Sequence, residues 1–249
     1  MKPLVAALRF LTIAPIPGSW GSAEEDLARS VPWFPVIGLV LGLAAAALAW
    51  VLWLVAPPMV CAGALVVALV SFSGCMHLDG LADTADGLLS SRSRERALAI
   101  MKDSHVGAMG VMAIVGAQLL KFAALASLSA EAIWGASLLM PLAGRCALVL
   151  HLAFLPYART SGLASAFYRR RPRRAAIWAA GILAATAWCV LGSRGLVVWL
   201  ACMAVTLAFS GYVYHRIGGA SGDTLGAVCE IVEAVPALAL ALGPMGQAR

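Results

Sequence analysis

The sequence predicts an all-α fold, a polytopic bundle of transmembrane helices. Of the 249 residues, 62% are hydrophobic and only 12% are charged, whereas a soluble domain carries about 25% charged residues. The mean hydropathy is +0.90, and apolar runs follow one another along the whole chain. A chain of this composition lacks the polar surface that a soluble protein shows to water, so the sequence favours lipid as its surroundings.

Seven segments approach the length of about 20 apolar residues that a membrane span needs. They are Val31–Ala56, Met59–Met76, Val106–Ser127, Ile133–Leu155, Ala175–Leu191, Leu196–Tyr214 and Ala227–Leu242. The last is the shortest, so we predict about seven spans, with six as the alternative. No stretch has the composition of a separate soluble domain, and residues 1–249 are therefore predicted to form one integral membrane domain.

The N-terminal segment, residues 1–30, is similar to a signal peptide only at its start. Arg9 interrupts the apolar run, and Pro15 and Pro17 follow without a small-residue cleavage site. We predict an interfacial segment that stays on the protein. The six cysteines include no C-x-x-C pair and lie in or beside apolar segments, so neither a disulfide framework nor a zinc site is expected.

Basic residues predict how the chain is oriented in the membrane. Of the 18 lysines and arginines, 14 fall in the N-terminal segment and in the loops 77–105, 156–174 and 215–226. Topology places all four segments on one face, which the positive-inside rule makes cytoplasmic, so the N-terminus is predicted inside the cell. Topology also explains the net charge of +6, and nucleic-acid binding is not predicted. The arginine run 169–174 is typical of a topology signal and of contact with lipid headgroups, with attraction of an anionic substrate as the alternative.

Most acidic residues gather at this same face. Of the twelve, seven lie at or near the predicted cytoplasmic ends of spans: Asp79, Asp83, Asp86, Asp103, Asp223, Glu230 and Glu233. Asp79, Asp83 and Asp86 are spaced i, i+4 and i+7, which places them on one stripe of a helix. Each carboxylate at a helix centre in a membrane costs about 2.5–3.5 kcal/mol, and Mg²⁺, which prefers oxygen ligands, would offset that cost. The alternative is a solvated loop with three ordinary surface aspartates.

Two further segments carry candidate functional residues. Before the third predicted span, Gly107 and Gly110 expose backbone N–H groups at a helix start, which together with Lys102 would suit an anion. A cap made by Asp103 or Ser104 is the alternative.

Before the last predicted span, a glycine-rich turn leads into a helix that carries Asp223, Glu230 and Glu233. Such a turn suits a phosphate, and acidic groups inside an apolar span are functional by default. The alternative is a flexible loop with a capping aspartate. Arg145, inside the fourth predicted span, is expected to face the bundle interior and to pair with a carboxylate or a substrate phosphate, with snorkelling to the edge as the alternative.

Five motifs, in order along the chain, resemble the adenosylcobinamide-GDP ribazoletransferase family, also named cobalamin-5′-phosphate synthase. They are F-L-T-I-A-P-I-P (10–17), W-F-P-V-I-G (33–38), H-L-D-G-L-A-D-T-A-D-G (77–87), M-K-D-S-H-V-G-A-M-G (101–110) and G-D-T-L-G-A (222–227). The resemblance implies a Mg²⁺-dependent enzyme of the bacterial inner membrane. It would join α-ribazole or its 5′-phosphate to adenosylcobinamide-GDP, release GMP, and so complete the cobalamin nucleotide loop.

On this hypothesis the partners are these two substrates and membrane lipid; the oligomeric state is left open, a homodimer included. One or two Mg²⁺ ions would be held by Asp79, Asp83 and Asp86, with Asp223 and Glu230 completing the metal shell from the other side of the bundle. Asp103 or Asp86 would accept the proton of the attacking hydroxyl, and Lys102 would stabilise the leaving phosphate. The residues expected to bind substrate are His77, His105, Gly107, Gly110, Arg145, Gly222 and Thr224.

Two other functions remain open at the level of sequence. A CDP-alcohol phosphotransferase also carries a D-G…D…D helix at a membrane face, but here the spacing is tighter and no A-R follows Asp79-Gly80. A transporter or magnesium channel would place its carboxylates along a path across the membrane, whereas these are predicted at one face.

Overall fold

The computed structural model describes residues 1–90, 92–159, 162, 164–169 and 172–243. In this part of the chain the regular elements are helices, and one isolated bridge pairs Tyr157 with Ala220. The elements are α1 (Lys2–Leu11), α2 (Glu24–Ala28), η1 (Val31–Trp33), α3 (Phe34–Val55), α4 (Pro58–Phe72), α5 (Met76–Leu88), α6 (Arg94–Ile100), α7 (Ala108–Ala126), α8 (Ala130–Phe154), α9 (Ser165–Tyr168), α10 (Arg173–Leu191), α11 (Ser193–Ile217) and α12 (Gly222–Ala241). The predicted all-α fold is confirmed.

The number of candidate spans agrees with the sequence. Among the described residues, six helices are long and apolar enough to cross a membrane, and a seventh span results if α4 and α5 are counted together. The last of them, α12, has 20 residues and is longer than predicted. It begins at Gly222 because Ser221 and Thr224 form a capping box that starts the helix there. The cytoplasmic position of the N-terminus stays a prediction.

The second predicted span, Met59–Met76, has the wrong bounds. The helix α4 ends at Phe72, after 15 residues, and α5 leaves it at an angle of 88°. Between them Gly74 and Cys75 both have positive φ angles, of 59° and 64°, which break the helix and turn the chain. This turn allows the aspartate-bearing segment to form a separate helix beside the bundle end.

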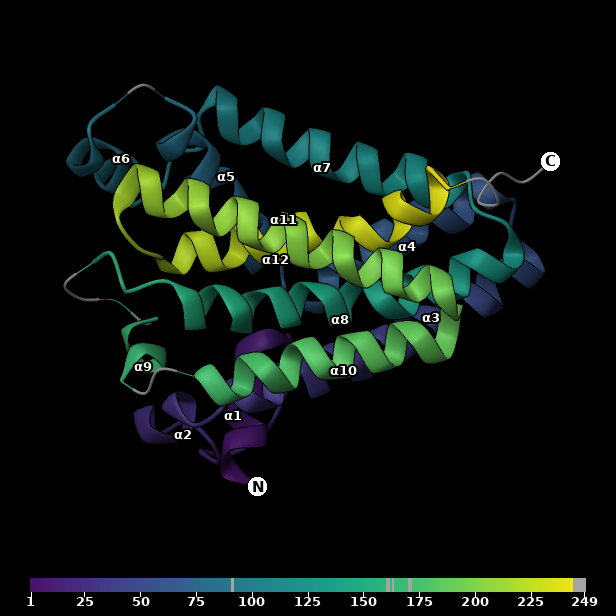
Figure 1. The fold of residues 1–249 in the computed structure, drawn as a ribbon, viewed down its shortest axis with the longest axis horizontal. Coiled ribbons are helices and arrows are strands. Elements are labelled where there is room, and N and C mark those ends of the chain that lie inside the picture. Colours follow the sequence, from purple (N-terminus) through teal and green to yellow (C-terminus); the bar gives the residue numbers. More distant parts are fainter. Residues whose placement is uncertain (91, 160–161, 163, 170–171, 244–249) are drawn as a thin grey trace.

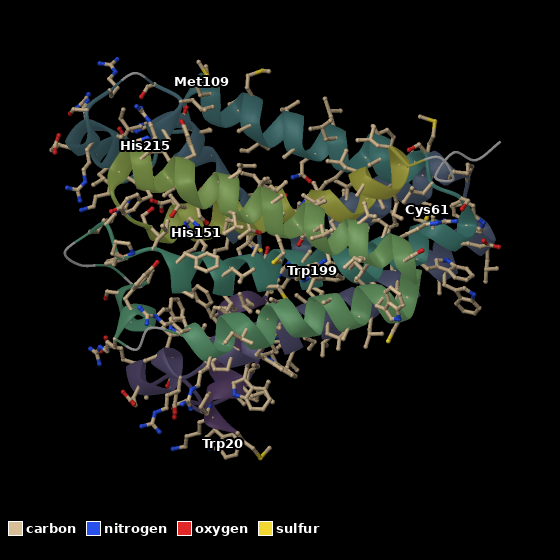
Figure 2. The ribbon with its side chains drawn as sticks, viewed as in Figure 1. Trp20, Cys61, Met109, His151, Trp199 and His215 are labelled. Atoms are coloured by element: carbon tan, nitrogen blue, oxygen red, sulfur yellow. The ribbon has the colours of Figure 1, made fainter. Side chains whose placement is uncertain are left out.

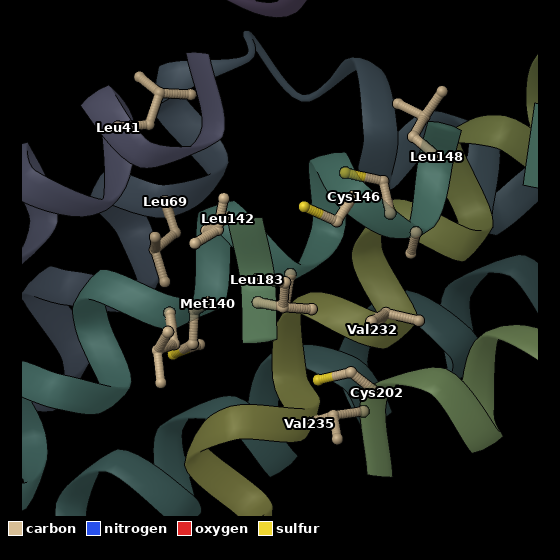
Figure 3. Packing of buried hydrophobic residues seen from close by; sticks show 14 of the residues in the cluster. Leu41, Leu69, Met140, Leu142, Cys146, Leu148, Leu183, Cys202, Val232 and Val235 are labelled. Carbon is tan, nitrogen blue, oxygen red and sulfur yellow. The ribbon is translucent and has the colours of Figure 1, made fainter. Parts of the chain in front are cut away.

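The two most buried helices, α8 and α12, form the centre of the bundle. In the most apolar 18-residue stretch of each helix, 89% of the residues of α8 and 78% of those of α12 are buried. The corresponding values for the other four single-helix spans are 22–33%. Figure 1 shows α8 crossing the middle of the molecule, with α5, α7, α11 and α12 on one side and α10 on the other. Figure 3 shows Cys146 of α8, Leu183 of α10, Cys202 of α11 and Val232 of α12 in this shared core.

Small residues let the central helices approach closely. A Cβ atom on Gly144 of α8 would lie 2.8 Å from the carbonyl oxygen of Cys229 on α12, and one on Gly38 of α3 would lie 3.0 Å from that of Pro141. Close backbone packing of this kind stabilises helices where lipid removes the hydrophobic drive for association. All six cysteines are free thiols, as the sequence predicts.

One end of the bundle collects the polar segments. Figure 1 shows α5, α6 and α9 at this end, together with the start of α10 and the end of α11, while α12 ends at the other end. The N-terminal segment is folded against the bundle, since the N–H of Ile13 donates to the carbonyl of Phe72 at 3.0 Å, and within the segment Arg9 donates a hydrogen bond to the carbonyl of Ile16 at 2.8 Å. Its predicted place at the membrane interface is untested.

Candidate active site

The site begins where α5 crosses α12, at a contact between two glycines. A Cβ atom on Gly80 would lie 2.7 Å from the carbonyl oxygen of Asp223, and a Cβ atom on Gly226 would lie 3.1 Å from that of His77. The two helix backbones therefore touch, with no room for side chains between them. Because Asp79 adjoins Gly80 in the sequence, the crossing brings carboxylates from two distant motifs to one place.

Four carboxylates lie around this crossing, and we name them the aspartate group: Asp79, Asp83, Asp86 and Asp223. The other three all act electrostatically on Asp83, and so does the guanidinium of Arg159. The side chain of Asp79 is exposed and those of the other three are half-buried. The helical stripe predicted for α5 is thus present, and the group carries more negative than positive charge.

Arg159 is a site residue that the sequence analysis assigned only to topology. Its Nη2 atom donates to Oδ2 of Asp223 at 2.6 Å, with 14% and 18% of the two side chains exposed. It also donates to the carbonyl of Met101 at 3.4 Å. The signal in the sequence was its position, four residues after the predicted end of a span and apart from the run 169–174. Arg159 offsets one charge of the aspartate group and leaves the remainder uncompensated.

Asp86 caps the N-terminus of α7. Its Oδ2 accepts the N–H of Gly107 at 2.7 Å, and its Oδ1 accepts the N–H of Gly110 at 2.8 Å. The backbone N–H groups of the two glycines thus bind an anion, but this anion is the carboxylate of Asp86 and not a substrate phosphate. The expected alternative cap from Asp103 or Ser104 is wrong, because the carboxylate of α5 lies closer to these N–H groups. A substrate phosphate would have to displace Asp86 to reach them.

The loop between α6 and α7 exposes Lys102, Asp103 and His105 to solvent. Oδ1 of Asp103 lies 2.6 Å from Nδ1 of His105 and also accepts the N–H of that residue at 3.1 Å. The hydrogen bond from the imidazole lowers the pKa of Asp103, and the same bond raises the pKa of His105. A carboxylate with a lowered pKa is a weaker base, which counts against Asp103 as the general base.

Glu230 lies away from the aspartate group, in an interior ion network with Lys121, Arg145 and Glu233. Nζ of Lys121 contacts Oε1 of Glu230 at 2.6 Å and Oε1 of Glu233 at 2.8 Å. Arg145 pairs with the other oxygen of Glu233, and Gln118 donates to Glu230 at 2.7 Å. Glu230 is seven residues beyond Asp223, about 10 Å along the helix. One metal ion therefore does not reach both carboxylates, and the prediction that they share it is not supported.

Three residues predicted to bind substrate lie inside the protein. His77, Arg145 and Thr224 are 3%, 1% and 0% exposed. Arg145 takes the first of its two predicted partners, a carboxylate. The hydroxyl of Thr224 belongs to the capping box with Ser221 and lies 3.2 Å from Nε2 of His151.

His151 itself sits between helices (Figure 2) and is bonded on its other side to Ser210. The polar atoms of Thr224 are thus committed to packing α12 against α8 and α11. Gly222, at the first turn of α12, is exposed, and its predicted contact with substrate stays a prediction.

The donor set of the aspartate group can be compared with what a metal ion requires. Among the described residues, no group of three or more His, Cys, Asp or Glu side chains is arranged to hold a metal ion. Mg²⁺ needs less, since it is bound by one or two carboxylates together with water and substrate phosphates. Oxygen ligands that carry excess negative charge suit this ion and do not suit zinc. A magnesium ion that is held by one or two carboxylates of the aspartate group and completed by substrate therefore stays our prediction for this site.

The fold and the site together define a class: a polytopic helical membrane protein with an acidic site at one end of its bundle. A sequence model of the cobalamin-5-phosphate synthase family matches residues 3–241, and the chain belongs to this family. The resemblance stated from the motifs is confirmed.

Named relatives cover nearly the whole chain. The adenosylcobinamide-GDP ribazoletransferase of Geotalea daltonii is 40% identical over 227 residues, 91% of this chain and 92% of its own. Those of Pseudomonas putida and a Roseiflexus species are 40% and 42% identical, over 98% and 96% of this chain and 100% and 89% of their own. No solved structure matches the chain.

Proposed function

We propose that this chain transfers α-ribazole or its 5′-phosphate to adenosylcobinamide-GDP and releases GMP, giving adenosylcobalamin or its 5′-phosphate. The family match over residues 3–241 and the names of the relatives support this reaction. The observation that carries the chemistry is the aspartate group at the crossing of α5 and α12. It brings carboxylates from two separate motifs to one end of the bundle.

We infer that the reaction takes place on the cytoplasmic side of the bacterial inner membrane. The aspartate group lies on the same end as the basic loops, and the positive-inside rule assigns that end to the cytoplasm. Both nucleotide substrates would be present there. The remaining basic residues of this end would attract the anionic substrates before they bind.

Each residue of the site has its own role in the proposed phosphoryl transfer. A hydroxyl oxygen of the ribazole attacks the phosphorus attached to cobinamide, the bond to the GMP oxygen breaks, and GMP leaves with its negative charge. Two of the carboxylates of Asp79, Asp83 and Asp223 would hold Mg²⁺, which would neutralise charge on the diphosphate as in other phosphotransferases of class 2.7.8. Arg159, already beside Asp223, is placed to contact a phosphate oxygen, and Lys102 would stabilise the leaving group.

Two carboxylates remain candidates for the base that takes the hydroxyl proton. Asp86 is half-buried and next to Asp83, but both its oxygens accept backbone N–H groups. Asp103 is exposed and bonded to His105. Of the two we favour Asp86, because each of its oxygens keeps a free lone pair and it belongs to the aspartate group.

The test is the release of GMP by purified protein supplied with adenosylcobinamide-GDP, α-ribazole and Mg²⁺. Asp83→Ala should lower the rate by more than about 100-fold, as the loss of one group that stabilises charge in a transition state does. Glu131→Ala, which removes an exposed carboxylate from the opposite end of α8, is the matched control. Full activity of Asp83→Ala with an unchanged Mg²⁺ requirement would remove this site. CDP-diacylglycerol as a better substrate would favour a phospholipid synthase instead.

A further inference from the structure

An apolar groove runs between α8, α10 and α11, away from the aspartate group. Its volume is about 660 Å³, and the residues that line it include Leu150, Phe154, Ala180, Trp199 and Met203. Figure 1 shows α10 on the opposite side of α8 from α5. Because all three helices are candidate spans, the groove opens toward the hydrocarbon of the membrane. An occupant of this groove must therefore be apolar along its length.

A second cavity adjoins the groove at the polar end of the bundle. It has a volume of about 450 Å³, and Arg29, Arg173 and Arg174 all line it. Arg173 also lines the apolar groove, so the two cavities meet at this side chain. Arg29 forms an exposed ion pair with Glu25 at 2.7 Å. Within the described residues, no acidic side chain forms an ion pair with Arg173 or Arg174.

The combination defines the chemistry of the occupant. Arg29 is already paired with Glu25, so the two guanidinium groups of Arg173 and Arg174 are the ones that need an anion, and guanidinium groups bind phosphate well. The adjoining groove is lined mainly by apolar side chains, so a flexible hydrocarbon chain fits it. From residue 173 to residue 180, α10 rises about 10 Å, which corresponds to the upper part of one acyl chain in a leaflet. A soluble nucleotide would satisfy the arginines but would leave the groove unfilled.

We propose that this composite site, the groove with Arg29, Arg173 and Arg174, binds one anionic phospholipid. The acyl chain lies along α10 between α8 and α11, and the phosphate meets Arg173. Basic pockets beside transmembrane helices recognise anionic headgroups in this way. The site would fasten α10 to η1 and α2 at the surface, since residues of both segments line the basic cavity. The inference does not depend on the reaction that the chain catalyses.

The test uses Trp199 as a reporter inside the groove. Purified full-length protein in non-ionic detergent micelles is titrated with phosphatidylglycerol or phosphatidylcholine that carries brominated acyl chains, which quench nearby tryptophan fluorescence. The measured signal is the part of the fluorescence quenching that the unaltered protein shows and the Trp199→Phe variant does not. We expect phosphatidylglycerol to quench this component at about one fifth of the concentration that phosphatidylcholine needs. A fivefold difference corresponds to about 1 kcal/mol, the contribution of one arginine at an anionic membrane surface.

Two variants separate the headgroup from the chain. Arg173→Gln should raise the concentration of phosphatidylglycerol required by about fivefold and that of phosphatidylcholine by less, because the choline group already balances the phosphate of the latter. Arg92→Gln, which removes an exposed arginine from the same end, should change neither value. Ala180→Leu should fill the groove and abolish Trp199 quenching by both lipids. Equal quenching by the two lipids in the unaltered protein, or an unchanged preference in Arg173→Gln, would overturn the proposal.

Discussion

The interior ion network gives the sharpest test of how this bundle is held together. Lys121 is completely buried and contacts Glu230 at 2.6 Å and Glu233 at 2.8 Å. Its replacement by methionine keeps most of the side-chain volume and removes only the ammonium group. We expect Lys121→Met to destabilise the folded protein strongly, because two glutamates on α12 would lose a shared partner.

The expected size follows from the balance of charge in the network. Lys121 and Arg145 carry two positive charges, and Glu230 and Glu233 carry two negative ones, so the network is neutral as a whole. Lys121→Met leaves one uncompensated negative charge where the carboxylates are no more than 5% exposed. Breaking a buried ion pair from one side costs about 3–5 kcal/mol. We therefore expect the free energy of unfolding to fall by that amount.

A second substitution should restore part of this loss. In Lys121→Met with Glu230→Gln the network is neutral again, with Glu233 still paired to Arg145 and Gln118 next to the new amide. The free energy of unfolding is measured in mixed micelles of increasing SDS fraction, followed by tryptophan fluorescence. Lys2→Met, the same chemical change at an exposed position of α1, is the control. The reasoning is refuted if Lys121→Met lies within about 1 kcal/mol of the control, or if the double variant is less stable than the single one.

Three further predictions concern the candidate active site. Gly80→Ala should slow GMP release by more than about tenfold, because its Cβ atom would lie 2.7 Å from the carbonyl of Asp223 and would separate the two helices; an unchanged rate would contradict the close crossing. Asp86→Asn should lower the free energy of unfolding by about 1 kcal/mol, since a charged cap is lost from α7, and the SDS titration measures it against Glu131→Gln. Asp103→Asn should bring the pKa of His105 down toward its ordinary value, because Asp103 raises it; a proton NMR titration that finds no downward shift would exclude the pair in solution.

The fold and the acidic face could be predicted because lipid imposes strong and simple rules. Runs of apolar residues have to become helices in a bilayer, and the positions of arginine and lysine then group the loops. The i, i+4, i+7 spacing on α5 needed only helical periodicity. The turn at Gly74 and Cys75 was missed because hydropathy does not report a break between two apolar segments.

The partners of individual side chains could not be predicted in the same way. The cap that Asp86 makes on α7 joins positions 21 and 24 residues apart, and the ion pair of Arg159 with Asp223 joins positions 64 apart. Such pairs depend on how helices cross, which hydropathy and spacing leave open. Lys121 and Arg145 were visible as charges inside apolar spans, but only the packed structure shows that glutamates of α12 balance them.

The carboxylates of this protein separate into two sets by how their charge is balanced. Glu230 and Glu233 lie deep in the bundle, and each is paired with a buried cation. These ion pairs balance the charge of both carboxylates, so no ligand is needed to explain why they are buried. A transport path would need polar groups in the interior that are free to exchange partners, and these two are not. The aspartate group has four carboxylates, that of Asp83 and the three around it, and one guanidinium, that of Arg159. Uncompensated charge, rather than the number of acidic residues, is therefore the observation that supports our proposal of a divalent cation and a diphosphate at this place.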